Sequence, residues 1–201
     1  MTSITSLTKE CLIDFETRVK EAFLTQKIHA PIHLSGGNEA QLIDIFRDVR
    51  PQDWVFSTWR NHYHALLKGI PEEWLYQEIL AGRSMYISSK EHRFLSSSIV
   101  GGILPIACGM AMGIKRLGLN ERVWVFIGDM SAHTGICFET SRYARGHNLP
   151  MTVVVEDNGL STNTPTRQVW GMDFGEQTGY GCYKYKRSYP HVGVGEFVTF
   201  G

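Results

Sequence analysis

Two short apolar runs constrain the fold of this chain more than any other feature of its sequence. Residues 123–127 and 151–155 are apolar runs of the kind found in strands of a parallel sheet covered on both faces. A helix is expected between them, over 135–146, and another before them, over 103–117. Strands that alternate with helices predict an α/β fold with a mainly parallel sheet and helices on both faces.

Further elements are expected on either side of this stretch. The first half should hold an amphipathic helix over 7–28, a helix from Asn38 to Val49, a strand in 53–58 and a helix between Pro71 and Gly82. The helix over 103–117 is apolar nearly all round, which predicts burial on both sides. Residues 1–201 are expected to form one domain. Within it, 161–201 should form a loop, a strand in CYKYKRSY (182–189) and a tail at a subunit interface.

Composition argues against several classes of protein. Lys and Arg together number 20, as do Asp and Glu, and this balance argues against a nucleic-acid partner. No apolar run is long enough for a membrane span, and the N-terminus does not read as a secretory signal, so a cytoplasmic protein is expected. The four cysteines lack metal-ligand or redox spacing, which predicts reduced thiols that act as small apolar fillers: Cys11, Cys108, Cys137 and Cys182.

An acid and an amide follow the two apolar runs. Asp129 comes after the first run and Asn158 after the second, and ligands of open parallel sheets bind beyond the carboxyl ends of strands. One carboxylate, one amide oxygen and a nearby backbone carbonyl form a hard-oxygen site. Magnesium with so few protein ligands completes its shell from water and phosphates, which predicts a magnesium–diphosphate site. The alternative is that both residues are ordinary turn or cap residues.

The 29 positions between Asp129 and Asn158 resemble the thiamine-diphosphate signature, in which Gly-Asp-Gly precedes a distant Asn. The chain is most similar to the alpha subunit of the first component of 2-oxo-acid dehydrogenases. That family has Gly, Phe-Glu, Leu-Pro and Glu-Asn-Asn at the offsets of Gly135, 138–139, 149–150 and 156–158. The resemblance implies a thiamine-diphosphate-binding fold and a Mg²⁺ ion held by Asp129, Asn158 and the main chain of Leu160.

Other stretches carry the same resemblance. His33 lies in HLSGGNEA, and Arg60 and His62 lie in TWRNHYHALLKG. The turn 98–100 lies in SSSIVGGILPIACGMAMG, and Arg187 and His191 lie in YKRSYPHVG. The implied catalytic residues are His33, His62 and His191. The implied cofactor-binding residues are Trp59, Arg60, Ser98, Ile99, Val100, Gly128, Asp129, Met130, Ser131, Asn158 and Arg187.

The chain departs from the family pattern at three places. Met130 replaces the second glycine of Gly-Asp-Gly, and Trp59 replaces the tyrosine before the arginine. Residues 166–180 leave less room than the family uses there for a helix and a strand.

The resemblance also implies a partner chain. In the family, the glutamate that activates the cofactor belongs to a separate beta-type, pyrimidine-binding subunit, and two such pairs form a heterotetramer. The implied reaction is decarboxylation of a 2-oxo acid with acyl transfer. Two alternatives stay open. The chain could be the N-terminal half of a split transketolase acting on a ketose, because EDNGLSTNTPT also resembles a transketolase sequence. It could also be a degenerate alpha-like subunit that binds a partner without cofactor.

Overall fold

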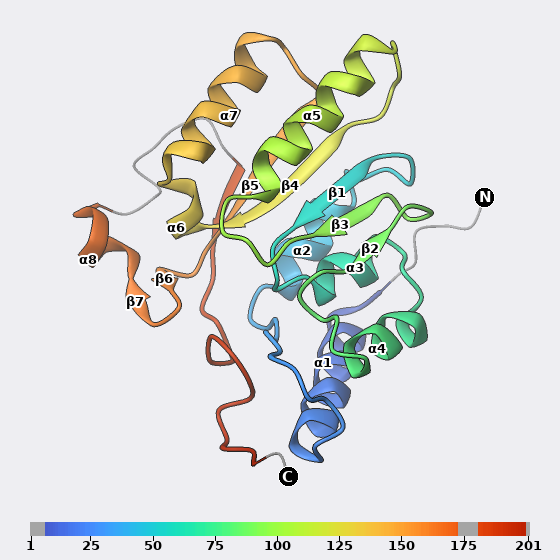
Figure 1. The fold of residues 1–201 in the computed structure, drawn as a ribbon, viewed down its shortest axis with the longest axis vertical. Helices are drawn as coiled ribbons and strands as arrows, with labels where there is room; N and C mark the ends of the chain where they lie inside the picture. The colour runs from blue at the N-terminus through green and yellow to red at the C-terminus, as the bar shows by residue number, and fades with distance from the viewer. Residues whose placement is uncertain (1–6, 173–180, 200–201) are drawn as a thin grey trace. The chain divides into compact units, whose positions relative to one another are not determined.

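The computed structural model describes residues 7–172 and 181–199 and divides the chain into two compact units that are interleaved in sequence (Figure 1). Unit 1 comprises Met1–Pro51, Trp59–Ser98 and Lys186–Gly201, and unit 2 comprises Gln52–Thr58 and Ile99–Tyr185. Within the part of the chain that is described, every helix is too short or too polar to cross a membrane.

Unit 2 is built on a parallel sheet with the strand order β1-β4-β5-β8. The strands are β1 (Trp54–Ser57), β4 (Val123–Gly128), β5 (Met151–Asp157) and β8 (Gly181–Lys184). All three pairings between neighbours are parallel, and the β4–β5 register runs from Val123 opposite Met151 to Gly128 opposite Glu156. The predicted α/β class with a mainly parallel sheet is therefore confirmed.

The helices of unit 2 connect these strands (Figure 1). The longer ones are α5 (Ile103–Arg116) and α7 (Gly135–Gly146), which pack on each other, and α5 also packs on β4. The shorter elements follow the carboxyl ends of β4 and β5: α6 (Asp129–Ala132), the hairpin β6 (Leu160–Ser161) and β7 (Thr164–Pro165), and α8 (Thr166–Trp170). The long connections are thus helical, and the short elements gather where the acid and the amide were predicted.

Unit 1 is mainly helical. Its elements are α1 (Lys9–Leu24), α2 (Glu39–Phe46), α3 (His62–Leu67), α4 (Glu72–Leu80) and the antiparallel hairpin β2 (Ser88–Ser89) and β3 (Phe94–Ser96). The predicted amphipathic face of α1 is buried at Leu12, Phe15 and Val19. Pro71 is the N-cap of α4, and Gly82 lies just past its end with φ +80°, as the sequence predicted.

Some predictions about burial and strand length are wrong. Helix α5 is not buried on both sides in this chain, since Ile106 on its outer face is 50% exposed. Of the four cysteines, all of which are free thiols, only Cys108 and Cys137 are buried, while Cys11 and Cys182 are exposed. The strand expected over 182–189 ends at Lys184, because the chain beyond Tyr185 belongs to unit 1.

Candidate functional site

The acid and the amide lie at the same edge of the unit 2 sheet. Because β4 and β5 are paired neighbours and Gly128 lies opposite Glu156, the residues that follow each strand emerge side by side. Asp129 is the first residue of α6, and Asn158 follows the last residue of β5. The predicted proximity of the two strand ends is confirmed.

Asp129 is almost completely enclosed, with 1% of its surface exposed. Its Oδ2 accepts a hydrogen bond from the Thr166 hydroxyl, and its buried Oδ1 has no hydrogen-bond partner within the described residues. Burial raises the pKa of the Asp129 carboxyl above its ordinary value, whereas the contacts with Thr166 and the backbone of Asn158 lower it. A bound cation beside Oδ1 would offset the burial that disfavours the charged carboxylate.

Asn158 is held in an Asx-type turn. Its Oδ1 accepts a hydrogen bond from the Leu160 backbone N–H at 3.0 Å, and its Nδ2 donates to the Tyr185 hydroxyl at 3.0 Å. The turn continues through Gly159, whose φ is +71° and whose N–H donates to the Asp157 carboxylate. A left-handed φ of this size suits glycine, which explains the Asn-Gly pair after the strand.

These residues fit the magnesium ion that the sequence predicted. Among the described residues there is no cluster of three or more His, Cys, Asp or Glu side chains able to hold a metal, so any metal here would depend on few protein ligands. Asp129 offers a buried carboxylate oxygen without a partner, and the amide oxygen of Asn158 keeps a second lone pair. Oxygen donors of this kind suit Mg²⁺ that also binds water and phosphate.

The residues flanking Asp129 form the start of α6. Gly128 is the N-cap of α6, and Met130 is helical with a negative φ, so the backbone at the family's glycine position needs no left-handed conformation here. The Met130 sulfur accepts a hydrogen bond from the indole of Trp170 on α8, and Ser131 is 6% exposed. Residues of α6 and α8 therefore contact each other through side chains.

The turn 98–100, which was predicted to bind the cofactor, is exposed. Ser98 is the last residue of the second segment of unit 1, and Ile99 and Val100 begin the second segment of unit 2 with exposures of 69% and 57%. The backbone then turns through Gly101, whose φ is +72°. The exposed turn 98–100 is therefore accessible to a ligand or to a partner chain.

Two of the predicted histidines meet in unit 1. The rings of His33 and His191 have centroids 4.9 Å apart in an edge-on arrangement, and Trp59 lies 5.9 Å from His33 and 6.2 Å from His191. His33 is 6% exposed, and its Nδ1 has no hydrogen-bond partner among the described residues. The sequence motifs containing these three residues lie far apart in the chain, and unit 1 brings them together.

Arg60 joins the two histidine segments. Its Nε donates to the backbone oxygen of Leu34 at 3.1 Å, and its Nη2 donates to the backbone oxygen of His191 at 3.0 Å. Burial, and then the charge of Arg60, lower the pKa of His33 to about 3 and lower the pKa of His191 as well. Arg187 lies close enough for its charge to lower both pKa values further. Both imidazoles are thus neutral near pH 7.

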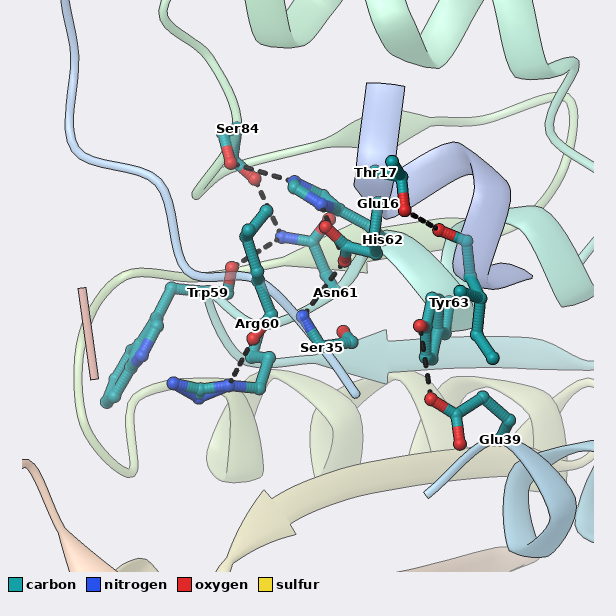
Figure 2. Close-up of polar contacts among 12 residues, drawn as sticks. Glu16, Thr17, Ser35, Glu39, Trp59, Arg60, Asn61, His62, Tyr63 and Ser84 are labelled. Atoms are coloured by element: carbon teal, nitrogen blue, oxygen red, sulfur yellow. Dashed lines mark hydrogen bonds and ion pairs between the residues drawn. The ribbon is translucent and has the colours of Figure 1, made fainter. Parts of the chain in front are cut away.

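His62 lies in the interior of unit 1 (Figure 2). Its Nδ1 is 3.1 Å from Glu16 Oε1, and its Nε2 is 2.8 Å from Ser84 Oγ. All three side chains are completely buried. With both ring nitrogens engaged and no surface exposed, the geometry argues against the predicted direct role of His62 in catalysis, because a proton donor to substrate must reach it.

Glu16 also holds the segment next to His33. The Ser35 backbone N–H donates to Glu16 Oε1 at 2.9 Å, and the Leu34 carbonyl of the same peptide group accepts from Arg60, as Figure 2 shows. The peptide group between Leu34 and Ser35 is therefore held on both sides: its N–H donates to a carboxylate, and its C=O accepts from a guanidinium. Glu16, Ser84, Thr166 and Tyr185 were all missed by sequence reasoning, and only the helical position of Glu16 on the buried face of α1 could have suggested one of them.

The comparisons with known proteins identify relatives over most of the chain. The family model described as dehydrogenase E1 component matches residues 8–183. The alpha subunit of acetoin:2,6-dichlorophenolindophenol oxidoreductase from Cupriavidus necator is 30% identical over 161 residues, which cover 75% of this chain and 48% of that protein. The chloroplastic pyruvate dehydrogenase E1 component subunit alpha-3 of Arabidopsis thaliana is 29% identical over 160 residues, which cover 72% of this chain and 37% of that protein.

The chain therefore spans about half or less of the length of these curated relatives. A solved structure of a candidate thiamin diphosphate-dependent enzyme from Mycobacterium smegmatis aligns with a TM-score of 0.44 and 18% identity, over 61% of this chain and 20% of that one.

Proposed function

The chain belongs to the dehydrogenase E1 component family, and from that premise we propose that it is an alpha-type subunit that binds Mg²⁺ and the diphosphate of thiamine diphosphate. The observation that carries the proposal is the buried, unpartnered Oδ1 of Asp129, next to the amide of Asn158 at the end of two parallel strands. An enclosed carboxylate oxygen without a hydrogen bond is costly unless it serves a ligand.

The proposed metal ligands are Asp129 Oδ1, Asn158 Oδ1 and the main chain of Leu160. Within unit 2, the proposed diphosphate contacts are the backbone of Gly128, Met130 and Ser131. Within unit 1, Arg60 and Arg187 are proposed separately as phosphate-binding side chains. Arginine suits phosphate oxygens, because its planar guanidinium can donate two hydrogen bonds at once. Trp59 and the turn 98–100 complete the proposed cofactor contacts.

When bound, thiamine diphosphate supplies the centre that stabilises a carbanion next to a carbonyl carbon. We assign His33 and His191 to hydrogen bonds with the substrate oxygens, because each imidazole is neutral near pH 7, carries one ring N–H, and lies beside the other. His62 would act one step away, through the Glu16 contact to the backbone of Ser35. The proposed reaction is decarboxylation of a 2-oxo acid with transfer of the acyl group.

The proposed partner is a beta-type subunit that supplies the activating glutamate, in a heterotetramer of two chains of each kind. The exposed apolar side chains of α5 and its preceding turn, such as Ile99 and Ile106, are suited to a subunit contact. Residues 181–199 of the tail are also proposed for this contact, and Phe197 there is 94% exposed. The part of the tail over 173–180 lies outside the described residues.

Two alternative functions make different predictions. A split transketolase would accept ketose phosphates, whereas the proposed subunit would accept 2-oxo acids, and a degenerate subunit would bind neither cofactor nor substrate. The name of the Cupriavidus necator relative adds acetoin to the compounds worth testing. The retained acid and amide favour a chain that binds the cofactor.

The test is calorimetric titration of thiamine diphosphate and MgCl₂ into the full chain, alone and co-purified with a beta-type subunit from the same organism. Asp129→Ala should abolish magnesium-dependent binding, and Glu139→Ala on the exposed face of α7 is the matched control. Turnover of pyruvate, a branched 2-oxo acid, acetoin and a ketose phosphate then separates the reactions. No binding by wild type in the two-chain preparation would favour the degenerate subunit, and full activity of the isolated chain would contradict the two-chain model.

A further inference from the structure

We propose that Thr166 and Tyr185 are positioning residues that orient the two side-chain metal ligands of unit 2, Asp129 and Asn158. The inference rests on the proposed function, because it concerns the same magnesium ligands. Each ligand side chain contacts one hydroxyl group, and the two hydroxyl groups come from different segments of unit 2.

Thr166 determines which oxygen of Asp129 remains for a metal. Its hydroxyl donates to Oδ2, and the two residues are 3% and 1% exposed, so water does not compete for this contact. With Oδ2 held, the carboxylate cannot rotate freely about its Cβ–Cγ bond, and Oδ1 keeps one direction. A metal would therefore meet a single, preoriented oxygen, which lowers the entropic cost of binding.

The backbone delivers Thr166 to this place. The chain leaves Asn158, forms the β6–β7 hairpin through Thr162, whose φ is +55°, and returns so that the Thr166 N–H donates to the Gly159 carbonyl at 2.9 Å. Figure 1 shows this hairpin and α8 following the end of β5. Thr166 is thus tied by its main chain to the Asn158 turn and by its side chain to Asp129, and links the two ligands.

Tyr185 determines the orientation of the Asn158 amide. The phenol oxygen accepts from Nδ2, which leaves Oδ1 on the side where the Leu160 N–H donates to it. A flipped amide would place its NH₂ group against the Leu160 N–H, two donors facing each other. The carbonyl oxygen that a hard cation needs is therefore held in place by a contact on each end of the amide.

The parallel pairing of β5 and β8 brings Tyr185 to Asn158. Tyr183 lies opposite Glu156 and Lys184 opposite Asp157, and the Tyr185 N–H donates to the Asp157 carbonyl at 2.9 Å. Side chains two positions apart in a strand point to the same face, so Tyr183 and Tyr185 lie side by side, with ring centroids 5.8 Å apart. Tyr183 contacts Glu156, which is not a proposed ligand, and this makes Tyr183 a matched control.

The experiment measures the apparent Kd of Mg²⁺ by calorimetry, with excess thiamine diphosphate, in the full chain co-purified with its beta-type partner. Thr166→Val should raise this Kd about tenfold, and Thr166→Ser should restore most of the affinity, because serine keeps the hydroxyl. Tyr185→Phe should raise the Kd by a smaller factor. Thr164→Val, an exposed residue of β7, and Tyr183→Phe should leave it unchanged. Melting temperatures without ligands identify any variant that fails to fold, and Thr166→Ala then replaces Thr166→Val.

The outcomes separate this inference from the function on which it rests. Wild-type Kd in both Thr166→Val and Tyr185→Phe, with binding abolished in Asp129→Ala, would overturn the positioning roles and leave the proposed function intact. Equal loss in Thr166→Val and Thr166→Ser would also overturn the role of the Thr166 hydroxyl, because a filled volume rather than a hydrogen bond would then matter. No magnesium-dependent binding by wild type would overturn the proposed function and this inference together.

Discussion

The two units differ in what their buried acid contacts. In unit 1, the completely buried Glu16 contacts both the Ser35 backbone N–H and the His62 ring through Oε1, while its Oε2 has no hydrogen-bond partner among the described residues. In unit 2, the buried Asp129 carboxylate has one oxygen bonded and one without a partner among the described residues. Glu16 connects α1 to two other segments of unit 1 and should therefore stabilise the fold, whereas Asp129 makes one side-chain hydrogen bond and its second oxygen can serve a ligand.

The largest expected effect is on the buried network of unit 1. Glu16→Ala removes the acceptor of both the Ser35 N–H and the His62 ring, and leaves two donors buried without partners. We expect a loss of roughly 3 kcal/mol in the free energy of unfolding, measured by urea denaturation. Glu21→Ala on the exposed face of α1 is the control and should change little. A loss no larger than that of the control would show that the Glu16 contacts do not stabilise the fold.

The next effect is a pH dependence that belongs to unit 1. Burial and Arg60 lower the pKa of His33 to about 3, against about 6.5 in the unfolded chain, so the unfolded chain binds more protons between these values. The stability that the neutral His33 contributes is present above about pH 6.5 and is lost as the pH falls toward 3. His33→Gln should lose less stability than wild type between about pH 6.5 and pH 4 in urea titrations at fixed pH. His29→Gln, at an exposed histidine, should show the same dependence of stability on pH as wild type. Identical pH dependence in wild type, His33→Gln and His29→Gln would contradict the lowered pKa of His33.

A smaller effect is expected at Arg60. Lysine carries one charged head and cannot donate to the Leu34 and His191 carbonyls in the geometry of a guanidinium. Arg60→Lys should lower the free energy of unfolding by about 1 kcal/mol, even without cofactor, measured by urea denaturation. Arg47→Lys, which alters an exposed ion pair with Asp44, should be silent within error. Wild-type stability together with weaker cofactor binding in Arg60→Lys would make Arg60 purely a ligand contact.

The smallest effect on stability is expected in unit 2, at the residue with the largest expected effect on binding. Burial raises the pKa of Asp129, so the folded chain gains little from its charge. Asp129→Ala should leave the melting temperature without ligand unchanged or slightly raised. A fall as large as that of Glu16→Ala would show that Asp129 stabilises the fold, and would remove the contrast between the two units.

Much of the fold could be read from local patterns. The runs at 123–127 and 151–155 became β4 and β5, and the helix predicted over 135–146 became α7 with the same bounds. The strand ends also predicted that Asp129 and Asn158 lie together, because parallel strands joined by one helix present their carboxyl ends at one edge. The prediction that α5 is buried on both sides was wrong, because apolar composition alone does not distinguish a core helix from a helix with one exposed face.

By itself, the sequence determined the α/β class, the adjacency of the acid and the amide, and the family to which the motifs point. Only the tertiary structure decided which groups those residues contact. Glu16 and His62 are 46 positions apart, Asp129 and Thr166 are 37 apart, and Asn158 and Tyr185 are 27 apart. Periodicity and capping act over a few residues, so they leave a local pattern, whereas a hydrogen bond between distant segments depends on how the whole unit packs.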